Sequence, residues 1–524
     1  MQVEVGAVFE GKVTGITKFG AFVEMPNGKN GMVHISEIAP TYVKEIRDHV
    51  TEGQMVKVKV LSIGEDGKVS LSMKRAQPPG NAIPVHIHDP QGAISSGSAT
   101  STNKFMANAW KQCYQGIRRC DVFFQNIDKV PMDAELKDRM IGEVEFLRAF
   151  FYATLLQRFG GVSILQAPLE LNEAIPPRET AENTYAFIID ELNKAVEKLP
   201  VRYTVSDEVG RATKGAALSL KAILHLYFAN YEEAEKDAKA VMDLNAYELY
   251  DDYEKLFLPE YKNNSEVIFD KQYMKEKYTN TIDQAYMPAM CGGWTVMSPT
   301  QDLVDAYQCI DGKSIHESPL FNPQDEFENR DPRLKASIMW NGRTFAGKVY
   351  NTFEGPDKLS SANATRTGYS LHKFIDEAND GCTQGSWTNY IYIRYAEILL
   401  TYAEARTRVS GPDASVYEAV NRVRQRKSVG LPPLPTNLTK DQMLDAIILE
   451  RRVELPFEGK RLFDIRRLRI AEKVMIQPVY GQLMNGEHVY IETRNFNPEK
   501  DYLWAIPLTE IDLSKGALKQ NPGY

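Results

Sequence analysis

The feature that most constrains the fold is a helical hairpin pattern that occurs twice. Residues 215–229 place apolar side chains every three or four positions, and after a tight turn near Asn230 the segment YEEAEKDAKAVM continues this spacing. The pattern returns in IYIRYAEILLTYAEAR, stops at Ser410-Gly411-Pro412 and resumes in SVYEAVNRVRQRK. Apolar residues at this spacing predict amphipathic helices, and the short breaks predict that each pair is antiparallel.

An arginine-rich segment, ERRVELPFEGKRLFDIRRLR, follows the second hairpin without room for a separate domain. Its cations alternate with Glu450, Glu454, Glu458 and Asp464 at helical spacing. An anion site would need positive charge without such compensation, so the interleaving favours an ion-pair network inside the scaffold. The hairpins themselves are typical of TPR-type repeats, which display or bind a partner.

Two further helices are predicted at residues 110–127 and 143–161, and both are rich in aromatic residues. The i+3/i+4 spacing of these residues favours core packing over a cofactor-binding role. Between the hairpins, roughly residues 250–390 are rich in glycine, proline, asparagine and aromatic residues. Loops on a rigid scaffold are where binding residues concentrate.

Flat aromatic side chains beside amides and carboxylates suit sugar rings, because a sugar has apolar C–H faces and hydroxyls that need partners. The alternative is that these rings only hold long loops in place. The candidate sugar-binding residues of this region are Trp294, Trp340, Trp387 and Tyr286.

Several long segments carry a family resemblance. They are, in order, EVEFLRAFFYATLLQRFGGV, GRATKGAALSLKAILHLYFANYEEAEKDAKAVM, NRDPRL, RYAEILLTYAEA, VNRVRQR, ILERRVELPFEGKRLFDIRRL, YLWAIPLTEI and QNPGY. Residues 102–524 thereby resemble the SusD/RagB family of nutrient-binding outer-membrane lipoproteins. The resemblance implies a large all-α domain with TPR-type hairpins and long loops. It also implies non-catalytic capture of glycans at the cell surface for a SusC-like TonB-dependent transporter.

Residues 1–76 follow a different pattern, in which apolar residues alternate at period two. Turns are predicted at Pro26-Asn27-Gly28 and Glu65-Asp66-Gly67, and a short helical piece at about residues 40–49. Five strands in this order predict a small all-β OB-fold barrel. The strands are predicted at residues 7–16, 19–25, 31–35, 56–63 and 68–74.

The barrel sequence contains side chains suited to single-stranded nucleic acid. Phe19 and Phe22 flank two small residues that leave aromatic faces open for base stacking, while Lys18 and Lys68 can meet phosphates. The alternative is that both phenylalanines belong to the barrel core.

The stretch EGKVTGITKFGAFVEMPNGKNGMVHISEIA followed by VKVKVLSIGEDGKVSLSMKRA resembles the S1 RNA-binding domain, in particular small S1 proteins of the general-stress type. The resemblance implies an RNA face formed by Phe19, Phe22 and His34. Gly64 and Lys68 stand where relatives often carry aspartate and arginine, which changes the far edge of this face.

Residues 77–101 are rich in turn-forming and small residues and are predicted to be a linker. Within them, His86, His88 and Asp89 lack a further placed ligand, so no metal site is expected. The five cysteines are scattered, odd in number and without a CxxC pair, so neither a zinc site nor a disulfide framework is indicated. No nucleophile motif or isolated carboxylate pair is present, so we expect neither an enzyme nor a cofactor.

Charge and targeting signals separate the two parts. Residues 1–75 hold 10 Lys+Arg and 9 Asp+Glu, so the net charge of −8 belongs almost wholly to the larger part and disfavours a broad nucleic-acid-binding face there. The sequence as written shows no signal peptide, lipobox cysteine or apolar run of about 18 residues, which predicts a cytoplasmic chain.

A cytosolic RNA binder and a cell-surface glycan binder do not share a compartment, so the sequence favours a fusion over a new role for the barrel. The alternative function is a cytosolic RNA-binding protein that acts through the S1 domain. The helical body would then serve as a TPR-type protein interaction scaffold.

Overall fold

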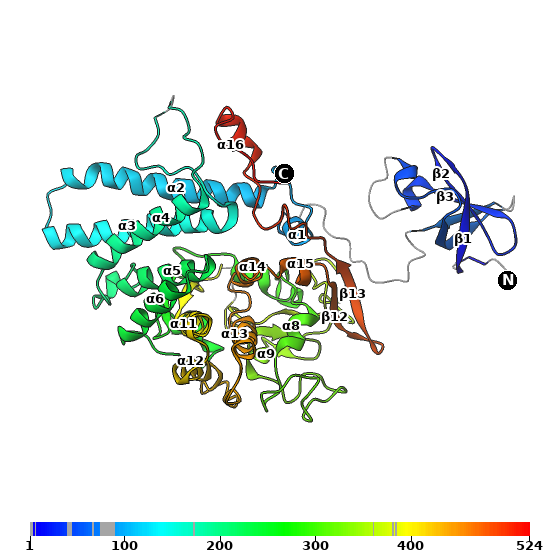
Figure 1. The fold of residues 1–524 in the computed structure, drawn as a ribbon. Coiled ribbons are helices and arrows are strands. Elements are labelled where there is room, and N and C mark those ends of the chain that lie inside the picture. Colours follow the sequence, from blue (N-terminus) through cyan, green and yellow to red (C-terminus); the bar gives the residue numbers. More distant parts are fainter. Residues whose placement is uncertain are drawn as a thin grey trace. The chain divides into compact units, whose positions relative to one another are not determined.

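The computed structural model describes residues 4–5, 7–38, 45–64, 68–73, 90–170, 173–359, 361–379, 382 and 385–524. The chain forms two compact units, and the boundary between them along the sequence lies after residue 83. The first is a small β-barrel and the second is a much larger, mainly helical body (Figure 1). The predicted multidomain fold, an OB-like barrel followed by a helical body with long loops, is confirmed.

Five strands close the barrel in the order β1–β2–β3–β5–β4. Only the β3–β5 pair is parallel. Alternation places Val56, Val58 and Val60 inside, where each is at most 5% exposed. The strands are β1 Val8–Thr17, β2 Gly20–Glu24, β3 Asn30–His34, β4 Met55–Ile63 and β5 Val69–Ser72.

Two short 3-10 helices, η1 (Ile35–Glu37) and η2 (Ile46–Asp48), lie between β3 and β4. The rest of the predicted helical piece, residues 40–44, lies outside the described residues. The same holds for the predicted turn at Glu65-Asp66-Gly67.

The second half of the predicted linker belongs to the body. Pro90–Ser95 forms helix α1, and Ala99 is buried in the main hydrophobic core. A Cβ atom at Gly97 would lie 2.2 Å from the carbonyl oxygen of Asn495, so the small residues here permit close packing. The first half, residues 77–89 with His86, His88 and Asp89, lies outside the described residues.

Three long helices begin the body: α2 (Lys104–Asn126), α3 (Ala134–Phe159) and α4 (Ala181–Lys198). α3 lies between the other two (Figure 1). Each begins at a residue whose side chain caps its first turn, and α3 ends at Gly160, whose φ is 75°.

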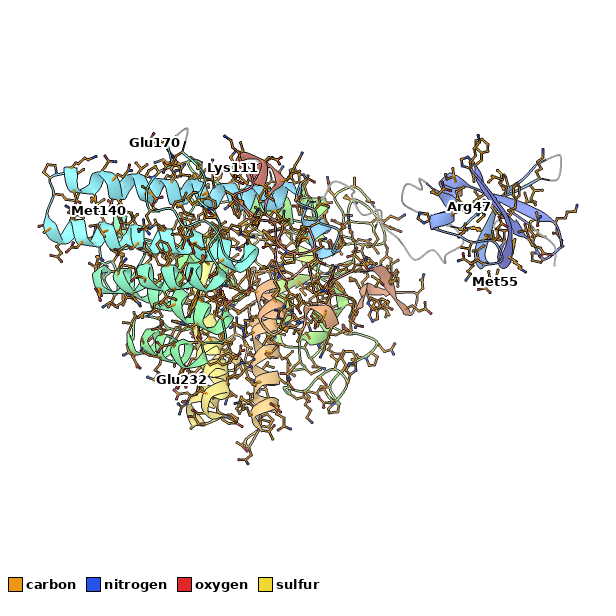
Figure 2. The ribbon with its side chains drawn as sticks, turned by 45° about the horizontal axis from the view of Figure 1, so that its top comes forward. Arg47, Met55, Lys111, Met140, Glu170 and Glu232 are labelled. Carbon is orange, nitrogen blue, oxygen red and sulfur yellow. The ribbon has the colours of Figure 1, made fainter. Side chains whose placement is uncertain are left out.

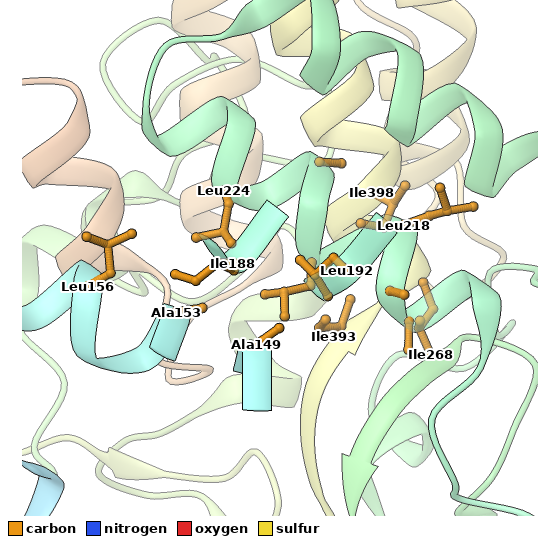
Figure 3. Close-up of a cluster of buried hydrophobic side chains, with 14 of the residues drawn as sticks. Ala149, Ala153, Leu156, Ile188, Leu192, Leu218, Leu224, Ile268, Ile393 and Ile398 are labelled. Atoms are coloured by element: carbon orange, nitrogen blue, oxygen red, sulfur yellow. The ribbon is translucent and has the colours of Figure 1, made fainter. Parts of the chain in front are cut away.

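Both predicted hairpins are present. The first pairs α5 (Lys214–Tyr227) with α6 (Tyr231–Asp243), and the second pairs α11 (Tyr395–Ser410) with α12 (Ala414–Arg424). Helix α13 (Lys440–Glu454) then packs on α11. The main core lies where α3, α4, α5 and α11 meet (Figure 3). Its labelled side chains include Ala149, Ile188, Leu192, Leu224 and Ile398, all 0% exposed.

The body is not purely helical. In its described residues, the long loops pair part of their backbone in four two-stranded sheets: β10–β7, β11–β6, β12–β13 and β8–β9. The loop region contains β6 Val267–Lys271, α7 Ile282–Tyr286, α8 Gln301–Ala306, α9 Pro332–Ser337, β7 Ile338–Met339, β8 Thr344–Phe345, β9 Lys348–Val349, β10 Ser370–Leu371 and β11 Tyr390–Arg394.

The C-terminal elements are α14 Arg461–Arg467, α15 Ala471–Val474, β12 Pro478–Met484, β13 Glu487–Thr493 and α16 Leu508–Leu513. Short 3-10 turns of the body are η3 Ile127–Lys129, η4 Ser206–Glu208, η5 Lys255–Phe257, η6 Pro259–Tyr261 and η7 Ala289–Cys291. In the described part of the chain, no helix combines the length and apolar character needed to cross a membrane.

Candidate functional site

The arginine-rich segment lies at the centre of a buried charge network. Glu454, the last residue of α13, accepts hydrogen bonds from Arg333 (2.8 Å), Arg394 (2.6 Å) and Arg426 (2.7 Å). All four side chains are at most 1% exposed. Burial alone would raise the pKa of Glu454, but the three guanidinium groups hold it well below its ordinary value.

The network extends on both sides of Glu454. Glu450 pairs with Arg333 (2.6 Å) and Glu458 with Lys373 (2.7 Å). Asp464 pairs with Arg451 (3.2 Å) and Arg467 (2.9 Å). The predicted ion-pair network is therefore confirmed. The three cations of Glu454, however, come from α9, from β11 and from the segment after α12 rather than from the same helix.

The candidate tryptophan with the most accessible ring is Trp294, which is 47% exposed. Its backbone N–H donates to the carbonyl of Gln284 at 2.8 Å, which ties its loop to α7. Tyr286 is the last residue of α7, but it is half-buried against the cluster that contains Phe345 and Leu371. Trp294 and Tyr286 therefore lie in connected parts of the same loop region. Of the two side chains, that of Trp294 is the more accessible to solvent.

Trp340 and Trp387 are less exposed than Trp294. The Trp340 ring is stacked on Phe327 with centroids 4.2 Å apart and planes at 10°, and the Arg343 guanidinium lies 4.6 Å from its centre. A ring covered in this way is less open to a sugar than the ring of Trp294. Trp387 is half-buried, with the Lys275 Nζ 4.8 Å from its ring centre.

The barrel places its aromatic candidates at the surface. Phe19 is 60% exposed and Phe22 is 36% exposed, so neither belongs to the buried barrel core. Gly20 pairs with His34 across β2 and β3, and the N–H of Ile35 donates to the carbonyl of Phe19 at 2.8 Å. His34 and Phe22 are therefore diagonal neighbours on the outer face. The structure places Phe22 and His34 on one face, and Phe19 lies in the turn that leads into β2.

The two candidate lysines lie at different places on this face. The Lys18 Nζ lies 4.9 Å from the centre of the Phe19 ring. Met32 of β3 pairs in parallel with Ser70 of β5, so Lys68, two residues before Ser70, lies toward the Asn30 end of β3 and away from His34. Lys68 is thus separated from the aromatic group, which the sequence alone did not indicate.

A cavity of about 500 Å³ lies within the body and was missed at the sequence level. Its walls come from α2, α3, α5, β11, α11, α13 and α14. The aromatic residues of α2 and α3 were assigned to the core by their spacing, and the spacing does not reveal that Phe150 and Phe151 border an open space. No group of three or more His, Cys, Asp or Glu side chains in the described part of the chain is placed to hold a metal ion.

Comparison with known proteins agrees with this division. Residues 265–524 match the SusD family, residues 81–226 match a family described as starch-binding associating with outer membrane, and residues 2–74 match the S1 RNA binding domain. SusD-like protein P2 of Formosa agariphila is 27% identical over 448 residues, which cover 80% of this chain and 81% of the relative. The protein YabR of Bacillus subtilis is 45% identical over 109 residues, which cover 21% of this chain and 82% of YabR.

Solved structures support the same assignment. A SusD-like carbohydrate binding protein from Bacteroides fragilis has a TM-score of 0.76 at 29% identity, covering 81% of this chain and 88% of that protein. A second SusD-like protein from Bacteroides fragilis has a TM-score of 0.74 at 32% identity, covering 82% and 89%. The chain therefore belongs to the SusD family through its helical body and carries an S1 RNA-binding domain before it.

Proposed function

We propose that the helical body captures glycans at the outer surface of an outer membrane without hydrolysing them and passes them to a SusC-like TonB-dependent transporter. Membership of the SusD family supports this function, as does the description of one solved relative as a carbohydrate binding protein. The observation that carries the proposal is the exposed ring of Trp294 on a loop of the scaffold.

The Trp294 loop is held by its own backbone. The N–H of Val296 donates to the carbonyl of Ala285 at 2.8 Å, in addition to the Trp294–Gln284 bond. Gly293 approaches so closely that a Cβ atom there would lie 2.1 Å from the carbonyl oxygen of Met287. A loop whose backbone is fixed in this way loses little conformational entropy when a sugar stacks on the Trp294 ring, which favours binding.

Affinity electrophoresis in gels that contain single polysaccharides tests the glycan site. Phe353 is a matched control, because it is 46% exposed on a different loop. Loss of an aromatic stacking contact is expected to weaken retention of Trp294→Ala roughly two- to tenfold, while Phe353→Ala is retained like the wild type. Equal retention of both variants, or none of the wild type on any glycan, would reject this site. A SusC-like partner that co-purifies while no glycan is retained would favour a protein-interaction scaffold.

We further infer that the barrel binds single-stranded RNA through Phe19, Phe22 and His34, with Lys18 at the edge. The exposure of both phenylalanine rings, with Phe22 and His34 on the same outer face of β2 and β3, is the observation that favours this second function. Fluorescence anisotropy with a labelled RNA oligonucleotide tests it. Affinity is expected to fall with salt, and Phe22→Ala is expected to cost roughly 1–3 kcal/mol.

Met55 is a suitable control for Phe22, because it is 58% exposed on β4 (Figure 2). If RNA binding is insensitive to salt, or if Met55→Ala and Phe22→Ala bind alike, the RNA face is placed wrongly. For such experiments we propose residues 1–76 as the RNA-binding domain, 77–89 as the junction and 90–524 as the glycan-binding domain, since α1 extends the predicted body from Thr102 to Pro90.

A further inference from the structure

The cavity in the body has the size and lining of a small-molecule site. Its volume of about 500 Å³ is within the usual range of roughly 300–1,000 Å³ for ligand pockets. Phe105, Asn108 and Gln112 line it and are exposed on one face of α2, so the cavity reaches solvent there. Deeper in, the wall is aromatic and includes Phe150, Tyr227, Tyr390, Tyr392 and Phe463.

Arg158 of α3 places a guanidinium group in this wall. One Nη1–H donates to the carbonyl of Thr154 at 3.1 Å, and the guanidinium carbon lies 5.0 Å from the centre of the Phe463 ring. A guanidinium has five N–H donors, so most of its hydrogen-bonding capacity is still available. Within the described part of the chain, no carboxylate forms an ion pair with Arg158.

The acids that line the cavity do not balance this charge, because each has its own cation. The pairs are Glu397–Lys460 (2.7 Å), Glu458–Lys373 (2.7 Å) and Asp464–Arg451 (3.2 Å). Arg158 therefore adds positive charge to a cavity whose wall is partly aromatic. A buried cation is costly unless it is paired, and a carboxylate matches the guanidinium fork with two parallel hydrogen bonds.

We propose that this cavity binds a ring-sized organic carboxylate, with Arg158 pairing with the carboxylate and the aromatic wall packing against the ring. Two classes of compound share this chemistry, hexuronic acids and aromatic carboxylates. For a sugar acid, Asn108 and Gln112 at the mouth supply partners for hydroxyl groups. The site is independent of the exposed Trp294 ring, so it goes beyond the proposed capture of glycans.

Isothermal titration calorimetry of the full chain tests the cavity with four probes: glucuronic acid, benzoate, glucose and inorganic phosphate. At least one carboxylate is expected to bind at least tenfold more tightly than glucose, which lacks the charge, and phosphate, which lacks the ring. Glucuronic acid and benzoate distinguish the two ligand classes. Failure of both carboxylates to bind the wild type would overturn the proposal, whatever the result at Trp294.

Two variants place the binding in the cavity. Arg158→Gln is expected to weaken binding at least about tenfold, while Arg119→Gln, an exposed arginine of α2, leaves it unchanged. Ala109→Phe fills the cavity from α2 and keeps Arg158, so it is also expected to abolish binding. Tryptophan fluorescence confirms folding of each variant. If Arg158→Gln does not fold, the binding measured for Ala109→Phe tests the proposal alone. If either variant folds and binds the carboxylate as tightly as the wild type, the site is not in this cavity.

Discussion

Replacing Glu454 with glutamine tests the charge network at its centre. The change removes one negative charge from the contact of Arg333, Arg394 and Arg426 and nearly preserves the shape of the side chain. A glutamine amide also presents N–H donors to groups that are themselves donors. Removing one partner of a buried ion pair costs about 3–5 kcal/mol, which is a large part of the roughly 5–15 kcal/mol that stabilises a domain.

Urea unfolding followed by tryptophan fluorescence measures this loss in the body alone. All five tryptophans, Trp110, Trp294, Trp340, Trp387 and Trp504, lie in the body, so the barrel contributes no tryptophan signal. Urea is uncharged and therefore does not screen the ion pairs, unlike guanidinium chloride. The midpoint of Glu454→Gln is expected to fall while the slope of the transition stays unchanged, because the surface exposed on unfolding is the same.

Glu418→Gln is the matched control, because Glu418 is exposed on α12 and no ion pair involves it among the described residues. Its effect is expected to be within about 0.5 kcal/mol, as is usual for surface positions. A loss for Glu454→Gln that exceeds the control by less than about 1 kcal/mol would refute the reasoning. The three arginines would then gain nothing from the charge of Glu454.

Three further outcomes are expected. Burial would raise the pKa of Asp464, but Arg451 and Arg467 lower it to about 2. A carboxylate whose pKa is lower in the folded state than in the unfolded state stabilises the fold at pH values above its unfolded pKa. This stabilisation is lost as the pH falls toward the folded-state pKa. The free energy of unfolding of the body should therefore fall by about 2 kcal/mol from this group between about pH 4 and pH 2, which lowers the urea midpoint. The fall should be smaller in Asp464→Asn, and a flat profile would contradict the pairing. A Cβ atom at Gly20 would lie 2.3 Å from the carbonyl oxygen of Val33, so Gly20→Ala should unfold the barrel, measured by lost RNA binding, and leave the tryptophan transition intact. Lys18→Gln should reduce the salt dependence of RNA affinity by the equivalent of about one phosphate contact. Lys68→Gln should reduce it less, because the strand register places Lys68 away from the aromatic residues. Equal effects of the two changes would contradict this placement.

Local patterns were sufficient for the strands of the barrel and for the hairpin helices of the body. In the barrel, the alternation of Val56, Val58 and Val60 fixes which face of β4 is buried, because side chains of a strand point alternately to its two sides. In the body, the spacing of small and apolar residues locates α5 and α6, because residues three and four apart share one helix face. The exposure of Phe22 also follows from alternation once its neighbours Ala21 and Val23 are placed inside.

Contacts between distant segments could not be derived in this way. The helical spacing of charges suggested local partners for Glu454, yet its cations lie 28, 60 and 121 residues away along the chain. The stacking of Phe327 on Trp340 likewise depends on how two loops cross, and no local pattern records it. The same reason explains the cavity, since Arg158 and Tyr390 meet there only after α3 and β11 are placed side by side.

The network also explains how a scaffold of hairpins can hold long loops in a fixed arrangement. Arg333 comes from α9, Arg394 from the end of β11 and Glu266 from the residue before β6, and all of them connect to α13 directly or through one partner. Buried ion pairs are no more stabilising than apolar residues of similar volume, but they are directional, so they accept only one placement of each segment. We infer that the main role of the arginine-rich segment is to hold the loop region in one position. It thereby also fixes the orientation of Trp294.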